Sequence, residues 1–188
     1  MIICDNRSEL LLLVQRGQPC LEVGVFAGDF ARQIDDICRP SRLCLIDAYA
    51  GQVFSCDEHG GNPRTFDGDS LHAQMKSECG FHGWSLQRGG SQAIMPQLPA
   101  NAFELVYIDA DHSEAGCRAD LEAGWRLLQS GGWLAGHDYS ITPGRCVNPM
   151  HYAGFGVKAA VDAFCESHGV SITAMAMDGY TSFAIRKP

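Results

Sequence analysis

Two short apolar segments of the chain end abruptly in carboxylates and imidazoles. The polar residues that follow them are Asp109, Asp111 and His112 in the first case, and His137 and Asp138 in the second. A buried strand reads as a nearly continuous apolar run, and its polar residues appear where it leaves the sheet. Ligands in open α/β sheets bind beyond the carboxyl ends of the strands, so these side chains predict a polar site able to hold a metal ion.

Alternating apolar and amphipathic segments predict the framework that positions these residues. Strands are expected at 20–25, 43–47, 84–88, 103–109, 133–136, 172–177 and 181–186. Helices are expected at 30–37, at 70–78 with Gly80 as the stop signal, from the cap Ser113 to Gly131, and at 156–168. The segment 50–65 reads as a loop, and Asp178-Gly179 as a hairpin turn. This order predicts an α/β fold with a seven-stranded, mostly parallel sheet, an antiparallel last strand and helices on both faces.

Composition narrows the function classes. The 188 residues suit a single domain, 1–188, and the formal net charge of −8 without any basic run argues against a nucleic-acid partner. Leu10–Val14 is too short to span a bilayer, so we expect no membrane partner and assign this run to the buried face of a first helix. Nine cysteines without a C-x-x-C pair favour reduced thiols and a cytoplasmic location.

A glycine-containing segment follows the first expected strand. Gly24 and Gly28 would allow a tight turn and a close approach of the backbone to a ligand, with Glu22 just before them. Phe26 and Asp29 occupy the second and third glycine positions of the dinucleotide fingerprint, which disfavours a nicotinamide-dependent oxidoreductase. An ordinary tight turn is the alternative for the two glycines.

Asp47 ends the second expected strand, about twenty residues beyond the glycine segment. A carboxylate at this position can accept hydrogen bonds from both hydroxyls of a ribose. Taken alone, Asp47 could equally cap a helix. Together with the glycine segment on the preceding strand, it favours nucleoside binding.

The pattern Glu22-x-Gly24-x₃-Gly28 resembles motif I of class I S-adenosylmethionine (SAM) methyltransferases. The segment Arg88–Leu98 resembles the adenine-side segment of catechol O-methyltransferases, which implies that Ser91 and Gln92 line the adenine. Over nearly its whole length the chain most resembles small bacterial enzymes related to the macrocin and caffeoyl-CoA O-methyltransferase types. The resemblance implies a Rossmann-like sheet and SAM as cofactor.

The resemblance also implies roles for the polar residues at the strand ends. In metal-dependent relatives the acid that ends the fourth strand binds Mg²⁺ beside the cofactor, and a basic residue three positions later deprotonates the acceptor hydroxyl; these positions are Asp109 and His112. Two consecutive residues after the next strand complete the metal site and correspond to His137 and Asp138, with Asp111 as a further candidate.

This chain departs from its relatives at two of these positions, His112 and His137. The plant and animal enzymes have Lys at 112, and acid or amide side chains at 137 and 138. Mg²⁺ prefers oxygen, so either His137 turns away and water replaces it, or the metal is softer; we expect the former.

We therefore expect methyl transfer to a hydroxyl of a small molecule or sugar, with His112 accepting the proton near its usual pKa of about 6.5. The alternatives are a metal-independent methyltransferase that uses His112 as its base, and a SAM- or nucleoside-binding module without catalysis. Asn148, His151 and Tyr152 are expected to contact the acceptor. A second copy of the chain, in a homo-oligomer, could help to close the site.

Overall fold

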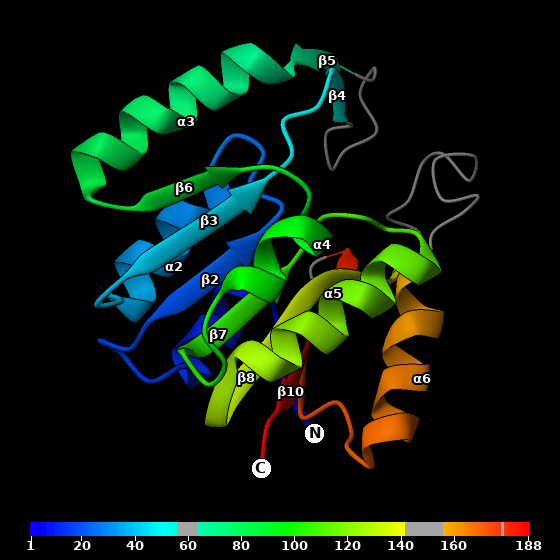
Figure 1. The fold of residues 1–188 in the computed structure, drawn as a ribbon. Coiled ribbons are helices and arrows are strands. Elements are labelled where there is room, and N and C mark those ends of the chain that lie inside the picture. The colour runs from blue at the N-terminus through cyan, green and yellow to red at the C-terminus, as the bar shows by residue number, and fades with distance from the viewer. Residues whose placement is uncertain (56–63, 142–155, 178) are drawn as a thin grey trace.

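The computed structural model describes residues 1–55, 64–141, 156–177 and 179–188 (Figure 1). Its main sheet has eight strands. In spatial order they are β1 (Ile2–Cys4), β9 (Ala174–Ala176), β10 (Tyr180–Arg186), β8 (Leu128–Ile141), β7 (Phe103–Ile108), β2 (Cys20–Val23), β3 (Leu43–Asp47) and β6 (Ser85–Arg88). A separate antiparallel pair, β4 (Gln52–Ser55) and β5 (Arg64–Asp67), lies where the sequence indicated a loop.

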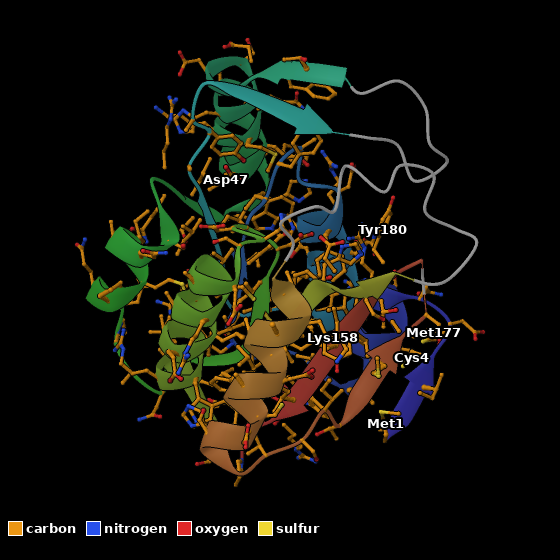
Figure 2. All side chains as sticks on the ribbon, turned by 90° about the vertical axis from the view of Figure 1, so that its right-hand side faces the viewer. Met1, Cys4, Asp47, Lys158, Met177 and Tyr180 are labelled. Atoms are coloured by element: carbon orange, nitrogen blue, oxygen red, sulfur yellow. The ribbon has the colours of Figure 1, made fainter. Side chains whose placement is uncertain are left out.

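The directions of the strands confirm the predicted sheet. Five adjacent strands are parallel to one another: β8, β7, β2, β3 and β6. Strand β10 runs antiparallel to both β8 and β9. One strand was not predicted: β1 pairs in parallel with β9 at the edge of the sheet. Figure 2 shows this edge, marked by Met1, Cys4 and Met177, far from Asp47. Three residues are too few to show the alternation that reveals a strand.

Helices cover both faces of the sheet, as predicted. Packed on one face are α1 (Arg7–Leu10), the 3₁₀ helix η1 (Leu11–Leu13), α2 (Asp29–Cys38) and α3 (Gly68–His82). Packed on the other are α4 (Ser91–Ile94), the 3₁₀ helix η2 (Met95–Gln97), α5 (Glu114–Leu127) and α6 (Val157–His168). Figure 1 shows α5 in front of the sheet and α2 behind it.

Local signals explain several helix ends and correct others. Ser113 caps α5 as predicted, since its hydroxyl accepts a hydrogen bond from the Gly116 amide at 3.1 Å. Helix α3 continues through Gly80 and ends at His82, with Gly83 as its C-cap at a φ of 75°. Helix α5 ends at Leu127, earlier than predicted, because β8 begins at the next residue.

The apolar run near the N-terminus forms α1 and η1 rather than one regular helix. Leu10, Leu11 and Val14 are buried, whereas Leu12 is 71% exposed. No helix in the described ranges is long and apolar enough to cross a membrane. The seven cysteines that the structure describes are all free.

Candidate functional site

A cavity of about 820 Å³ opens at the carboxyl ends of β2, β3 and β7. This volume is within the usual range for a small-molecule site. Its lining combines residues from five separate segments of the chain. They are Arg7, the run 22–26 with Asp29 and Phe30, the run 46–49, the run 89–93 and the run 109–112.

The glycine segment after β2 fits tightly against the end of β7. Gly24 has a φ of 90°, and a Cβ at this position would lie 1.9 Å from the carbonyl oxygen of Asp109. Phe26 also adopts a left-handed conformation, with a φ of 51°, at the position where the dinucleotide fingerprint has glycine. Gly28, which the sequence predicts to bind the cofactor, is not among the residues that line the cavity. It is the N-cap of α2, with a φ of 80°, and packs against Met75.

Asp47 holds the glycine segment in place. Its Oδ2 accepts hydrogen bonds from the backbone amides of Val25 and Phe26 at 2.7 and 2.8 Å, and its Oδ1 accepts one from the Tyr49 amide at 2.8 Å. Tyr49 donates its own hydroxyl to the Phe26 carbonyl at 3.1 Å. The carboxylate faces the cavity, so a ribose bound there would share an oxygen that already orders the loop.

Glu22 lines the cavity and is buried. The residue is 2% exposed, and Oε2 of Glu22 makes no hydrogen bond with any part of the chain that the structure describes. Burial raises the pKa of Glu22 well above its usual value, Asp109 adds to the rise, and Arg7 opposes it. Burying a polar atom without a hydrogen bond costs free energy. Glu22 Oε2 is therefore suited to accept a hydrogen bond from a donor group on a bound molecule.

Arg7 is a lining residue that the sequence did not reveal. It is the first residue of α1, and its guanidinium lies 5.0 Å from the centre of the Phe30 ring and 4.0 Å from Asp109 Oδ2. The nearby capping interactions of Asn6 and Glu9 indicate where the helix starts. They carry no information about the direction in which Arg7 points.

Ser91 and Gln92 also line the cavity, at the start of α4. Beneath them lies Asp120 of α5, which is 1% exposed. Neither of its carboxylate oxygens has a well-formed hydrogen bond within the described residues. Burial raises the pKa of Asp120 to about 6, although the neighbouring Ser91 hydroxyl opposes this rise.

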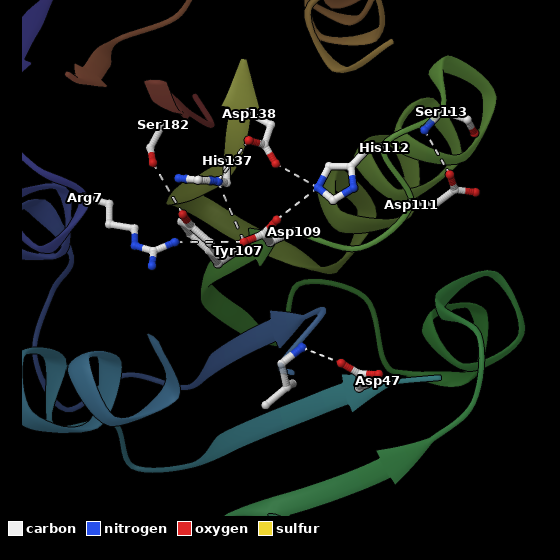
Figure 3. Close-up of polar contacts among 11 residues, drawn as sticks. Arg7, Asp47, Tyr107, Asp109, Asp111, His112, Ser113, His137, Asp138 and Ser182 are labelled. Atoms are coloured by element: carbon white, nitrogen blue, oxygen red, sulfur yellow. Dashed lines mark hydrogen bonds and ion pairs between the residues drawn. The ribbon is translucent and has the colours of Figure 1, made fainter. Parts of the chain in front are cut away.

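Four polar side chains meet at the ends of β7 and β8 (Figure 3). Asp109, His137 and Asp138 each offer one ligand atom, and these atoms all lie within 4.8 Å of one another. His137 Nδ1 is 3.3 Å from Asp138 Oδ1 and 4.0 Å from Asp109 Oδ2. His112 lies between the two carboxylates, with its Nε2 at 3.2 Å from Asp109 Oδ1 and 2.8 Å from Asp138 Oδ2.

The electrostatics of this cluster differ from the sequence-based expectation in two respects. His137 does not turn away, because its Nδ1 faces both carboxylates. His112 does not keep its usual pKa: burial lowers it, but the hydrogen bonds to Asp109 and Asp138 outweigh burial and raise it to about 10. His112 is therefore protonated at neutral pH while it bridges the two carboxylates.

Asp138 carries the strongest local signs of a functional position. Its φ is 59°, a left-handed value that is uncommon outside glycine. Burial raises the pKa of its carboxyl, but the hydrogen bonds from His112 and His137 dominate and hold it well below the usual value. Asp111, in contrast, lies outside the cluster and accepts a hydrogen bond from the Ser113 amide at 2.9 Å. Asn148, His151 and Tyr152, predicted to contact the acceptor, lie outside the described residues.

Solved structures of low sequence identity share this fold. The O-methyltransferase from Bacillus cereus in complex with SAH has a TM-score of 0.63 at 17% identity, and the match covers 96% of this chain and 79% of that one. A putative caffeoyl-CoA O-methyltransferase from Staphylococcus aureus has a TM-score of 0.63 at 12% identity, covering 95% and 80%. A SAM-dependent methyltransferase from Aquifex aeolicus has a TM-score of 0.60 at 15% identity, covering 96% and 92%.

No curated protein matches the chain. A family model described as a methyltransferase domain matches residues 21–139, from the start of β2 into β8. This region contains the glycine segment, Asp47, Ser91 and the Asp109–Asp138 cluster. Because the match covers more than half of the sequence, the chain belongs to this family and is a class I SAM-dependent methyltransferase.

Proposed function

We propose that this methyltransferase acts on a hydroxyl group of a small molecule or sugar, with a divalent cation held by Asp109, His137 and Asp138. One observation carries the proposal. The cavity that begins at the glycine segment and Asp47 reaches Asp109 and His112, and these two residues also belong to the polar cluster. A hydroxyl at this junction would face both the cofactor and the cluster.

The residues around the cavity fit SAM. Gly24 lines the cavity where the backbone turns tightly against the end of β7, the Asp47 carboxylate faces the cavity, and Glu22 Oε2 has no hydrogen-bond partner among the described residues. When bound, SAM supplies an electrophilic methyl group on a sulfonium. Transfer of this methyl to the acceptor oxygen would break its bond to sulfur and would give S-adenosylhomocysteine (SAH), a methyl ether and one released proton.

The polar cluster fits a divalent cation. Two carboxylates and one imidazole are a common ligand set for such ions. When bound, the cation would lower the pKa of the acceptor hydroxyl and favour the reactive alkoxide or phenolate. The inward-facing imidazole of His137 is a better ligand for Mn²⁺ or Fe²⁺ than for Mg²⁺, so we propose Mn²⁺ as at least as effective as the Mg²⁺ expected from sequence.

His112 has a positioning and a proton-transfer role in this proposal. It donates to Asp109 and Asp138 and so keeps two like charges close together. His112 can accept a proton from the hydroxyl only when these two carboxylates no longer hold it protonated. This requirement favours the metal-assisted reaction over one in which His112 alone is the base.

The proposal is tested by following SAH formation with a panel of catechols, other phenols and sugars. After EDTA treatment we expect turnover to fall at least about a hundredfold and to return with Mn²⁺ or Mg²⁺. Asp109→Asn and Asp138→Asn should prevent this recovery and weaken Mn²⁺ binding measured by electron paramagnetic resonance. Asp36→Asn on the exposed surface of α2 is the matched control, and it should respond to metal as the wild type does.

Each remaining outcome identifies one alternative. Full turnover after EDTA treatment, unchanged in Asp109→Asn, would contradict the metal site and favour His112 as the sole base. SAH binding without turnover on any hydroxyl in the panel would count against the O-methyl assignment and favour a cofactor-binding module.

A further inference from the structure

Two aromatic residues with unusual backbone angles line the cavity and are hydrogen-bonded to each other. Phe26 has a φ of 51° and Tyr49 a φ of 42°, so both adopt the left-handed conformation. Left-handed angles are unfavourable for bulky side chains, and they persist only where neighbouring groups hold the residue. The contacts that hold Phe26 therefore maintain the shape of this wall of the cavity.

The segment after β3 holds the backbone of Phe26. Asp47 Oδ2 accepts a hydrogen bond from the Phe26 amide at 2.8 Å, and the Tyr49 hydroxyl donates one to the Phe26 carbonyl at 3.1 Å. Both contacts involve peptide groups alone. They do not fix the Phe26 ring, because rotation of the side chain between rotamers leaves the peptide groups in place.

The ring of Phe26 packs against Phe66, which belongs to strand β5 of the β4–β5 pair. The two ring centroids are 5.1 Å apart and the ring planes meet at 86°, an edge-to-face arrangement. This arrangement is favourable because the positive edge of one ring faces the negative face of the other. Phe66 is half-buried and is not among the residues that line the cavity. It therefore supports the cavity wall from outside, through the Phe26 ring.

The base of the β4–β5 pair is joined to the same segment after β3. The Gly68 amide donates a hydrogen bond to the Gly51 carbonyl at 2.9 Å, which closes the base of the pair. A Cβ on Gly68 would lie 2.4 Å from the Tyr49 carbonyl oxygen, so the chain packs closely against Tyr49 at this point. Figure 1 shows the pair beyond the end of β3, where α3 begins. Phe66 thus reaches Phe26 from a base that is packed against the second strained residue.

We propose that Phe66 is a positioning residue for the cofactor: it holds the Phe26 ring and so keeps the glycine segment in the conformation that binds SAM and SAH. This role rests on SAM as the cofactor, and it does not depend on the proposed acceptor or cation. Phe66 needs no contact with the cofactor, because it acts through Phe26. Coupling is reciprocal, so a ligand that binds the ordered glycine segment also stabilises the contact of β5 with this segment.

Isothermal titration calorimetry with SAH on the full chain tests this role. Phe66→Ala should bind SAH about three- to tenfold more weakly, as expected for the loss of one edge-to-face aromatic pair. Phe66→Leu fills much of the same space and should lose less affinity. Phe81→Ala is the matched control, because Phe81 is an 86% exposed phenylalanine of the neighbouring helix α3. This control should leave the affinity for SAH unchanged.

A double-mutant cycle separates positioning from a general loss of stability. Because Phe66 acts through the Phe26 ring, Phe66→Ala should weaken SAH binding in the wild-type background and have little effect in a Phe26→Ala background. Amide hydrogen exchange gives a second measurement. SAH should slow exchange at residues 64–67 of the wild type, and it should do so less in Phe66→Ala.

An unchanged affinity for SAH in Phe66→Ala, or equal losses in the two backgrounds, would overturn the inference. If Phe66→Ala does not fold, Phe66→Leu in both backgrounds gives the same cycle. A wild-type chain that binds no SAH would contradict SAM as the cofactor, and this role with it. These measurements involve neither the acceptor nor the cation, so a failure of the proposed hydroxyl methylation would not change their outcome.

Discussion

Gly24 shows how one residue type can decide whether the cavity forms. Its φ is 90°, and a Cβ at this position would lie only 1.9 Å from the Asp109 carbonyl oxygen, so there is no space for a side chain. The close approach brings the end of β2 against the end of β7, where the cofactor and cluster residues meet. Only glycine permits both the backbone angle and this contact.

Gly24→Ala should destabilise the protein by more than about 2 kcal/mol and weaken SAH binding, because β2 and β7 must separate. Gly80→Ala is the matched control, because Gly80 is an exposed residue of α3 with open space around it. This control should raise the free energy of unfolding by about 0.5–1 kcal/mol, the helix preference of Ala over Gly. Urea denaturation measures both effects. Equal responses of the two variants would contradict the close contact at Gly24.

At the scale of single residues, the sequence predicted which side chains line the cavity better than it predicted their electrostatic surroundings. Glu22, Asp47 and Ser91 line the cavity as expected, because strand ends and loop positions follow from the apolar pattern. The raised pKa of His112 and the inward direction of His137 depend on distances between different strands. No local pattern encodes such distances, so they required the structure.

Helix α5 combines an exposed outer surface with a buried acid. Asp120 lies beneath Ser91 with no well-formed hydrogen bond among the described residues, and its pKa is raised by burial to about 6. A carboxyl whose pKa is raised on folding lowers stability as the pH rises from about 4 through 6. This loss of stability is fully present above pH 6, and it is absent below about pH 4, the pKa of the carboxyl in the unfolded chain.

Asp120→Asn should therefore increase the free energy of unfolding by about 1–3 kcal/mol at pH 8 and by little at pH 4. Chemical denaturation at both pH values measures the difference. The exposed Asp36→Asn is the control and should change stability little at either pH. A loss of stability in Asp120→Asn at pH 8 would mean that the Asp120 carboxylate is paired in solution.

Helices and strands could be predicted from the sequence where the apolar pattern extends over many residues. Short strands were predicted less well. The parallel strands and α6 follow the apolar periodicity closely. The edge strand β1 and the pair β4–β5 were missed, because their three or four residues show no period and their pairing is non-local. The position of Arg7 over the cavity depends on how α1 docks beside β9, which the sequence of α1 does not specify.

At the scale of the whole molecule, the order of the strands places the proposed cofactor cavity at the carboxyl ends of β2, β3 and β7. Solved structures with only 12–17% identity share this arrangement of strands and helices. Such likeness is possible because the fold depends on the order of apolar strands and amphipathic helices rather than on particular side chains. The acceptor is chosen by individual side chains around the cavity, and the acceptor screen identifies it.

The central claim is that the cavity at the ends of β2, β3 and β7 binds the adenosyl cofactor, and calorimetry on the wild-type chain tests it most directly. We predict binding of one SAH per chain, and an increase in stability of about 2.7 kcal/mol when SAH is present at a hundred times its Kd. NAD should not compete. Binding of NAD without any binding of SAH would contradict the account.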